Sequence, residues 1–242
     1  REGLRAAEVV VDIKKIPRLT SVEWREDGGL ELGASVPCTS IYGDQEIINA
    51  YPSIADSARI IGGWQIQSRA SIGGNLCNSS PAADSIPSLI VEKATCRIAG
   101  PEGERELPVG EFCTAPGKNC LGNDEFLVGL SFPAPAASSG SRYMRFIPRN
   151  EMDIAVVGVG TWVQLDADGE TIEAARIGLA AVAPTPLSAD EAGAWLVGKP
   201  ATEENFAAAG ELASKIASPI SDLRGPADYR VHLTGVIVKR AL

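Results

Sequence analysis

Residues 68–89 contain the side chains whose types and spacing could do chemistry, in the run SRASIGGNLCNSSPAADSIPSL. Gly73 and Gly74 remove two consecutive Cβ atoms, so the backbone there could approach a phosphate or a flat ring closely. Asp84 precedes an apolar segment, where its carboxylate could cap a helix or accept a hydrogen bond from a ligand hydroxyl. Hydroxyl and amide side chains surround the glycines: Ser71, Asn75, Asn78, Ser79 and Ser80.

A glycine pair among serines is also typical of an ordinary loop. Glycine patterns without structural context are weak signals of a ligand, so the residue types alone leave both interpretations open.

The single histidine restricts the remaining chemistry. His232 lies in a helical apolar pattern with Leu233 and Ile237, which favours a packed or capping residue over a catalytic base. With one histidine, triads and metal sites that depend on histidine are excluded. We predict no catalytic and no metal-ligating residue.

The five cysteines form an odd set without a CxxC pair. This pattern favours reduced, buried thiols over a disulfide framework or a zinc site. They are Cys38, Cys77, Cys96, Cys113 and Cys120.

Composition describes an ordinary globular chain of 242 residues, 45% hydrophobic and 22% charged. The formal net charge of −9 and the lack of a Lys/Arg stripe exclude a nucleic-acid partner. No apolar run approaches the roughly 20 residues of a membrane span, and no secretory signal is visible, so we expect a cytoplasmic protein.

Periodicity and turn residues predict the elements that position the glycine run. The segment Val9–Ile13 is β-branched and predicts a buried strand. The spacing over Gln45–Ile61 predicts a helix, ended by Gly62 and Gly63. Two hairpins and a further strand are also expected: strands 19–24 and 30–36, strands 94–98 and 105–107, and strand 126–132.

Composition changes at 133–140, which is all Pro, Ala, Ser and Gly and marks our expected domain boundary. Paired strands 154–165 and 171–182 follow it, and then come helices near 188–197, 203–217 and 226–241. The sequence therefore predicts an α+β chain with one domain over 1–135 and a second over 141–242.

The run ASIGGNLCNSSPAADSIPSL resembles the second FAD-binding motif of the medium subunits of molybdenum hydroxylases, the xanthine dehydrogenase and carbon monoxide dehydrogenase type. That motif usually reads T-I-G-G-N-x-x-x-x-S-P-x-x-D. Four stretches keep the family's order, so the resemblance covers essentially the whole chain: VVVDIKKIPRL, EFCTAPGKNCLGNDEFLVGLSFP, RYMRFIPRNEMDIAVVGVG and ADYRVHLTGVIVKRAL.

The resemblance implies a fold and a cofactor site. The fold is an FAD-binding domain of the vanillyl-alcohol-oxidase-like (PCMH) type, joined to a C-terminal domain with a three-stranded antiparallel sheet and a three-helix bundle. Arg145 occupies a position where the family usually has Lys, and its planar fork could alter that contact. The FAD contacts that the resemblance implies are Ile61, Gly62, Ser71, Ile72, Gly73, Gly74, Asn75, Asp84, Leu127, Val128 and Arg145.

The family's first glycine motif, A-G-G-T-D-L, lies upstream of the stretch matching VVVDIKKIPRL, and this sequence begins after it. We expect an N-terminally truncated chain that lacks most of the first subdomain and binds FAD weakly by itself.

The resemblance also implies a function in electron transfer. A large molybdopterin subunit oxidises the substrate, a small subunit relays electrons through [2Fe-2S] clusters, and FAD on this chain passes them to an external acceptor. The expected assembly is a dimer of heterotrimers. Two alternatives remain open, a free-standing FAD-dependent oxidoreductase and a cofactor-free scaffold subunit. One branch of the family binds an additional four-iron cluster through cysteines. We expect buried thiols here instead of such a cluster.

Overall fold

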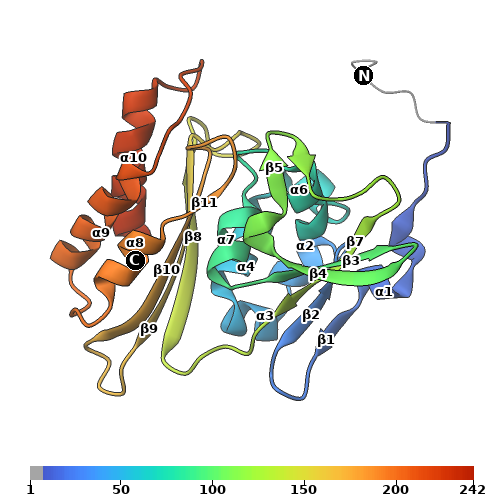
Figure 1. Cartoon of the computed structure of the whole chain (residues 1–242), viewed down its shortest axis with the longest axis horizontal. Coiled ribbons are helices and arrows are strands. Elements are labelled where there is room, and N and C mark those ends of the chain that lie inside the picture. The colour runs from blue at the N-terminus through green and yellow to red at the C-terminus, as the bar shows by residue number, and fades with distance from the viewer. Residues whose placement is uncertain (1–7) are drawn as a thin grey trace.

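The computed structural model describes residues 8–242 and contains two large antiparallel sheets separated by helices (Figure 1). A third, two-stranded sheet pairs Cys113–Ala115 with Lys118–Asn119. The first sheet has the strand order β1-β2-β7-β3-β4. Its strands are β1 (Val22–Trp24), β2 (Leu30–Gly33), β3 (Thr95–Gly100), β4 (Gly103–Pro108) and β7 (Phe126–Phe132).

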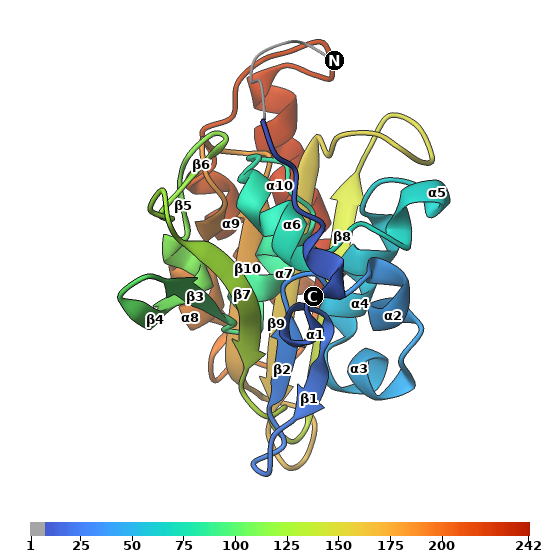
Figure 2. The ribbon, with the colours of Figure 1, turned by 90° about the vertical axis from the view of Figure 1, so that its right-hand side faces the viewer.

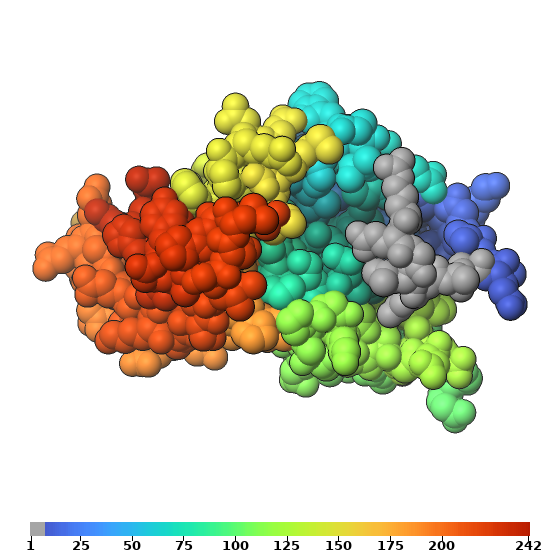
Figure 3. All heavy atoms as spheres, turned by 90° about the horizontal axis from the view of Figure 1, so that it is seen from above, coloured from blue at the N-terminus to red at the C-terminus, as the bar shows by residue number. Residues whose placement is uncertain are grey.

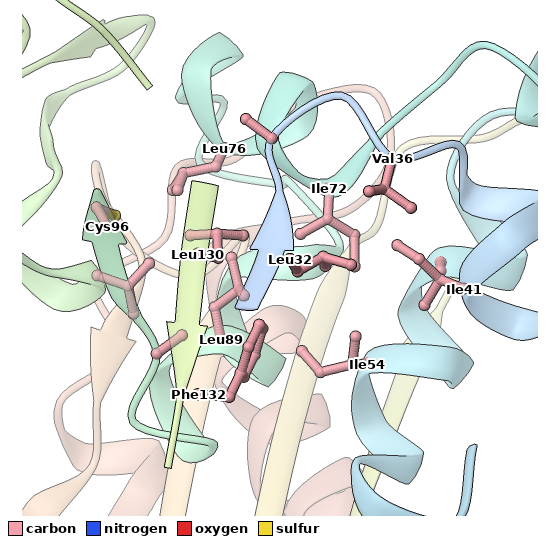
Figure 4. Close-up of a cluster of buried hydrophobic side chains, with 14 of the residues drawn as sticks. Leu32, Val36, Ile41, Ile54, Ile72, Leu76, Leu89, Cys96, Leu130 and Phe132 are labelled. Atoms are coloured by element: carbon pink, nitrogen blue, oxygen red, sulfur yellow. The ribbon is translucent and has the colours of Figure 1, made fainter. Parts of the chain in front are cut away.

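Helices cover one face of this sheet and bury the first hydrophobic core. In Figure 4, Leu32 and Leu130 from the strands point toward Ile72 and Leu76 from a helix above them. The elements between and beside these strands are η1 (Ile13–Lys15), α1 (Pro17–Thr20), α2 (Cys38–Tyr42), α3 (Gln45–Ala50), α4 (Pro52–Ile60), α5 (Trp64–Gln67), α6 (Ile72–Asn78), α7 (Ser85–Val91), η2 (Val109–Glu111), β5 (Cys113–Ala115) and β6 (Lys118–Asn119).

The second sheet has the order β11-β10-β9-β8 and packs its own core against three helices. The predicted three-stranded sheet is therefore extended by the two-residue strand β11. The elements are β8 (Ser139–Phe146), β9 (Val157–Leu165), β10 (Ile172–Ala180), β11 (Leu187–Ser188), α8 (Asp190–Leu196), α9 (Glu203–Lys215) and α10 (Ala227–Ala241).

Helices α4 and α7 lie between the two sheets, and Figure 2 shows the first sheet in front of them. Seen from above, the residues coloured orange and red form one end of the molecule (Figure 3). Gly160 and Gly178 allow β9 and β10 to approach α7, because a Cβ on either glycine would lie 2.7 Å from backbone atoms of Pro87. Real Cβ atoms do not pack this closely, so glycine is required for this contact.

The mixed α and β fold class is confirmed, and so are the two hairpins, strand 126–132, the paired strands β9 and β10 and the three C-terminal helices. The first hairpin is shorter than expected because Leu19 and Thr20 belong to helix α1. Strand β8 begins at Ser139, inside the expected boundary segment. The division into 1–135 and 141–242 stays a prediction.

The prediction of a buried strand over Val9–Ile13 is wrong. Val9, Val10 and Val11 are each at least 70% exposed, and the chain enters η1, whose cap is the Asp12 carboxylate accepting from the Lys14 amide. A β-branched run becomes a strand only where a neighbouring strand supplies hydrogen bonds. Strands β1 and β4 form the edges of the first sheet, and neither pairs with this segment.

The single helix expected over Gln45–Ile61 is two helices, α3 and α4. Tyr51 separates them with φ −137° and ψ 67°, outside the helical region. Pro52 follows, and a proline disfavours the helical conformation in the residue before it. Proline is favourable in the first turn of the helix that it begins.

No helix in the described part of the chain is both long enough and apolar enough to span a membrane.

Candidate functional site

Helix α6 places the glycine run at the surface of the first core. Ser71 caps the helix, and its Oγ accepts a hydrogen bond from the Gly74 amide at 3.1 Å. Ile72 and Leu76 point into the core, as Figure 4 shows. The antiparallel bridge between Pro37 and Ser71 turns the Ile72 amide toward the Val36 carbonyl oxygen. Among the described residues, no group accepts from the Gly73 amide, so this donor at the start of the helix is free for a ligand.

The two glycines have different surroundings. Gly73 is buried, and a Cβ there would clash with the backbone of Ala34. Gly74 is exposed, and within residues 8–242 the only atom near its Cβ position is the Ser71 Oγ at 3.1 Å. Gly73 is thus required for packing, whereas Gly74 leaves open space above the helix.

A cleft of about 780 Å³ opens over the start of α6, within the range of about 300–1,000 Å³ typical of small-molecule sites. Most of its wall is apolar. The lining residues are Val10, Val11, Asp12, Ile13, Lys14, Ile16, Ala34, Ser35, Arg69, Ser71, Gly73, Gly74, Cys77, Leu121, Phe126 and Leu127.

Two cations lie in this cleft. Lys14 donates from Nζ to the Ser35 carbonyl oxygen at 2.7 Å, and burial lowers the pKa of Lys14. The Arg69 guanidinium lies 3.4 Å from the Asp12 carboxylate, in an exposed pair. A free amide at a helix start, two cations and an apolar wall suit an anionic group attached to a flat ring. The residues present therefore fit a dinucleotide such as FAD.

The cleft contains four of the predicted contacts, Ser71, Gly73, Gly74 and Leu127. The others lie outside its lining. The side chains of Ile61, Ile72 and Val128 are buried and do not reach the cleft. Gly62 follows the end of α4 and has φ +65°. The remaining three, Asn75, Asp84 and Arg145, make the hydrogen bonds described next.

Asn75 joins α6 to α7. Its Oδ1 accepts from the Ser85 amide at 3.1 Å and from the Ser85 hydroxyl at 2.7 Å. The side chain thereby fixes the residue that follows Asp84.

Asp84 accepts two hydrogen bonds from strand β8. The Tyr143 hydroxyl donates to Oδ1 and the Arg145 guanidinium to Oδ2, both at 2.8 Å. The Asp84 side chain is 12% exposed and that of Arg145 8%. Burial raises the pKa of Asp84, although Arg145 and Tyr143 act in the opposite direction. The carboxylate makes no capping hydrogen bond to α7.

The sequence reasoning missed Lys14, Arg69 and Tyr143. Arg69 lies two residues before Ser71, so its charge beside the glycine run was a usable signal. Tyr143 precedes Arg145 by two residues, which places both side chains on one face of a strand.

All five cysteines are free thiols. Cys38 and Cys96 are buried, whereas Cys77, Cys113 and Cys120 are half-buried. Burial raises the pKa of Cys77 to about 11, so this thiol in the cleft is protonated at neutral pH.

The prediction that His232 is packed or capping is wrong. It is exposed on α10, whose buried face is formed by Leu233 and Ile237. A helix turns by about 100° per residue, so the position before Leu233 faces away from the core.

Comparison with known families gives two matches along the chain. Residues 1–135 match the model described as the FAD binding domain in molybdopterin dehydrogenase. Residues 142–242 match that of the CO dehydrogenase flavoprotein C-terminal domain.

Individual relatives agree with these matches. The xanthine dehydrogenase FAD-binding subunit of Escherichia coli O157:H7 is 31% identical over 96% of this chain and 80% of its own length. The carbon monoxide dehydrogenase medium chain of Hydrogenophaga pseudoflava is 32% identical over 97% of this chain and 80% of its own.

Solved structures show the same fold. Carbon monoxide dehydrogenase from Hydrogenophaga pseudoflava, lacking the Mo-pyranopterin moiety, has a TM-score of 0.89 at 32% identity, over 95% of this chain and 79% of that chain. Quinoline 2-oxidoreductase from Pseudomonas putida 86 has a TM-score of 0.84 at 26% identity, over 93% of this chain and 76% of that chain.

Proposed function

Because this chain belongs to the FAD-binding subunits of the molybdenum hydroxylase family, we propose that it transfers electrons from [2Fe-2S] clusters through FAD to an external acceptor. Its proposed partners are a large molybdopterin subunit and a small [2Fe-2S] subunit, in a dimer of heterotrimers in the cytoplasm. Bound FAD supplies the redox chemistry, and the chain supplies placement, burial and hydrogen bonds.

One observation supports the proposal most directly, the open space over Gly74 at the start of α6. The free amide of Gly73 would donate to the pyrophosphate of FAD. Lys14 would balance one of its negative charges, and Arg69, which pairs with Asp12, would lie beside the other. The apolar wall formed by Phe126 and Leu127 would exclude water from the bound cofactor.

The deeper predicted contacts have other proposed roles. Ile61, Ile72 and Val128 have buried side chains, and Gly62 follows the C-cap of α4, so these residues would support the site without lining the cleft. Asn75 positions α7, and Asp84 with Arg145 supplies a polar group at the junction with β8.

An absorption spectrum of the purified native complex tests the function. Flavin together with iron–sulfur bands is the expected result. Flavin alone would support a free-standing oxidoreductase instead, and neither chromophore would support a scaffold subunit.

Gly74→Val tests the site within the same complex. The added side chain enters the cleft and meets little protein, so the complex should assemble with its iron–sulfur bands and without flavin. Gly140→Val is the matched control, since its Cβ position has no atom within 4 Å and Gly140 lies outside this cleft. A full flavin content in Gly74→Val would exclude the start of α6 as a main binding element.

A further inference from the structure

The Asp84 carboxylate connects the two halves of the molecule. It begins α7 beside the first core, whereas its partners Tyr143 and Arg145 lie on β8 of the second sheet. Tyr143 is 4% exposed, so its hydroxyl has exchanged water for this one acceptor. Since the phenol donates to a carboxylate, the hydrogen bond is of the stronger, charge-assisted kind.

The same carboxylate is coupled to the cleft through one side chain. Asn75, one residue after Gly74 on α6, holds both the amide and the hydroxyl of Ser85. Asp84 therefore has a fixed position relative to the start of α6. Its direction is set from the other side, by Tyr143 and Arg145.

Two acceptor sites of the Asp84 carboxylate are not used by the described residues. An ionised carboxylate has about four lone-pair sites, and Tyr143 and Arg145 use one on each oxygen. The ionisable groups that face Asp84 are the charged Arg145 and the neutral Tyr143, and no other ionisable side chain among the described residues acts on it. Whether the carboxylate stays ionised in this buried place depends on these two partners.

We propose that Tyr143 is a positioning residue for the flavin, because its hydroxyl holds the Asp84 carboxylate turned so that it accepts a hydrogen bond from bound FAD. The inference rests on the proposed function, since it requires FAD at this site. Arg145 supplies the balancing charge, and Tyr143 supplies direction. A purely structural tyrosine would contribute packing and stability only.

Tyr51 provides the matched control. It is also buried, at 1% exposure, and its hydroxyl donates at 2.7 Å to the carbonyl oxygen of Pro133, a group that does not titrate. Tyr51→Phe therefore removes a buried hydroxyl and a hydrogen bond of similar length, but it removes no hydrogen bond to a carboxylate.

The test measures the dissociation constant of FAD between pH 6 and 9, by flavin fluorescence, in wild-type, Tyr143→Phe and Tyr51→Phe complexes. Loss of the Tyr143 hydrogen bond makes Asp84 easier to protonate. Binding in Tyr143→Phe should therefore weaken by about tenfold at pH 6 and by less at pH 9. Tyr51→Phe should keep the wild-type constant and pH profile.

A double-variant comparison with Asp84→Asn provides a second measurement, which does not depend on the stability of Tyr143→Phe alone. If Tyr143 acts through Asp84, adding Tyr143→Phe to Asp84→Asn should weaken FAD binding no further. Additive losses in the double variant, or a wild-type pH profile in Tyr143→Phe, would overturn the inference alone. A wild-type complex without flavin would overturn the proposed function and this inference with it.

Discussion

The cleft over α6 and the seam between α7 and the second sheet both depend on glycine, for opposite reasons. At the seam, formed by Pro87, Gly160 and Gly178, a Cβ would meet backbone at 2.7 Å. At the cleft, Gly74 faces open space. The difference shows that a glycine can permit close packing in one region and leave an open surface in another, and that its surroundings distinguish the two.

The ion pairs in these two regions also differ, because the side chains are exposed to different extents. The pair Asp84–Arg145 beside the seam is nearly buried, with 12% and 8% of the side chains exposed. The pair Arg105–Glu125, beside Leu121 and Phe126 at the rim of the cleft, is 41% and 23% exposed. Solvent screens the rim pair, so the two pairs should differ greatly in their effect on stability.

The largest expected effect is at the seam. Asp84→Ala leaves the Arg145 charge buried without its partner and should lower the free energy of unfolding by about 3–5 kcal/mol. Urea denaturation of the purified chain measures this value. Glu203→Ala is the control, because Glu203 is 89% exposed in its pair with Lys239 and its loss should leave the midpoint unchanged. Equal losses in both variants would remove the distinction between buried and exposed pairs.

The next effect compares the glycines directly. Gly160→Ala forces a methyl group against the Pro87 backbone and should destabilise the chain by about 1–3 kcal/mol. Gly74→Ala places its methyl group 3.1 Å from the Ser71 Oγ, and with a small shift of this hydroxyl it should stabilise the cofactor-free chain by about 0.4–1 kcal/mol. Opposite shifts of the urea midpoint are therefore expected. Destabilisation of both variants to the same extent would show that Gly74 is also a packing residue.

The smallest effect concerns the rim pair and pH. Hydrogen bonds from the Arg105 guanidinium lower the pKa of Glu125 to about 2, from an ordinary value of 4.5. A lowered folded pKa stabilises the protein above pH 4.5, and this contribution is lost as the pH falls toward 2. The difference in Tm between wild type and Glu125→Gln should thus be constant from pH 7 to 4.5 and then shrink. A difference that already declines between pH 7 and 6 would contradict this assignment.

The sequence by itself determined the elements that depend on local signals. Alternation and turn residues were enough for the hairpins and for the strand Phe126–Phe132. The glycine run alone left a ligand site and an ordinary loop both open, and its resemblance to an FAD-binding motif favoured the ligand site. Pro52 is also a local signal for the break between α3 and α4. The sequence analysis missed this break because the apolar residues on both sides of it have helical spacing.

Tertiary structure alone decided what surrounds each residue. Val9, Val10 and Val11 form a β-branched run, yet they are exposed because no described strand pairs with them. Asp84 meets Tyr143 and Arg145 from 59 and 61 positions away, so neither contact follows from spacing. Gly73 and Gly74 are identical and adjacent, but the helix turns one toward Ala34 and the other toward the cleft. Local conformation depends on neighbours in the chain, whereas burial, charge pairing and open space depend on which distant segments come together.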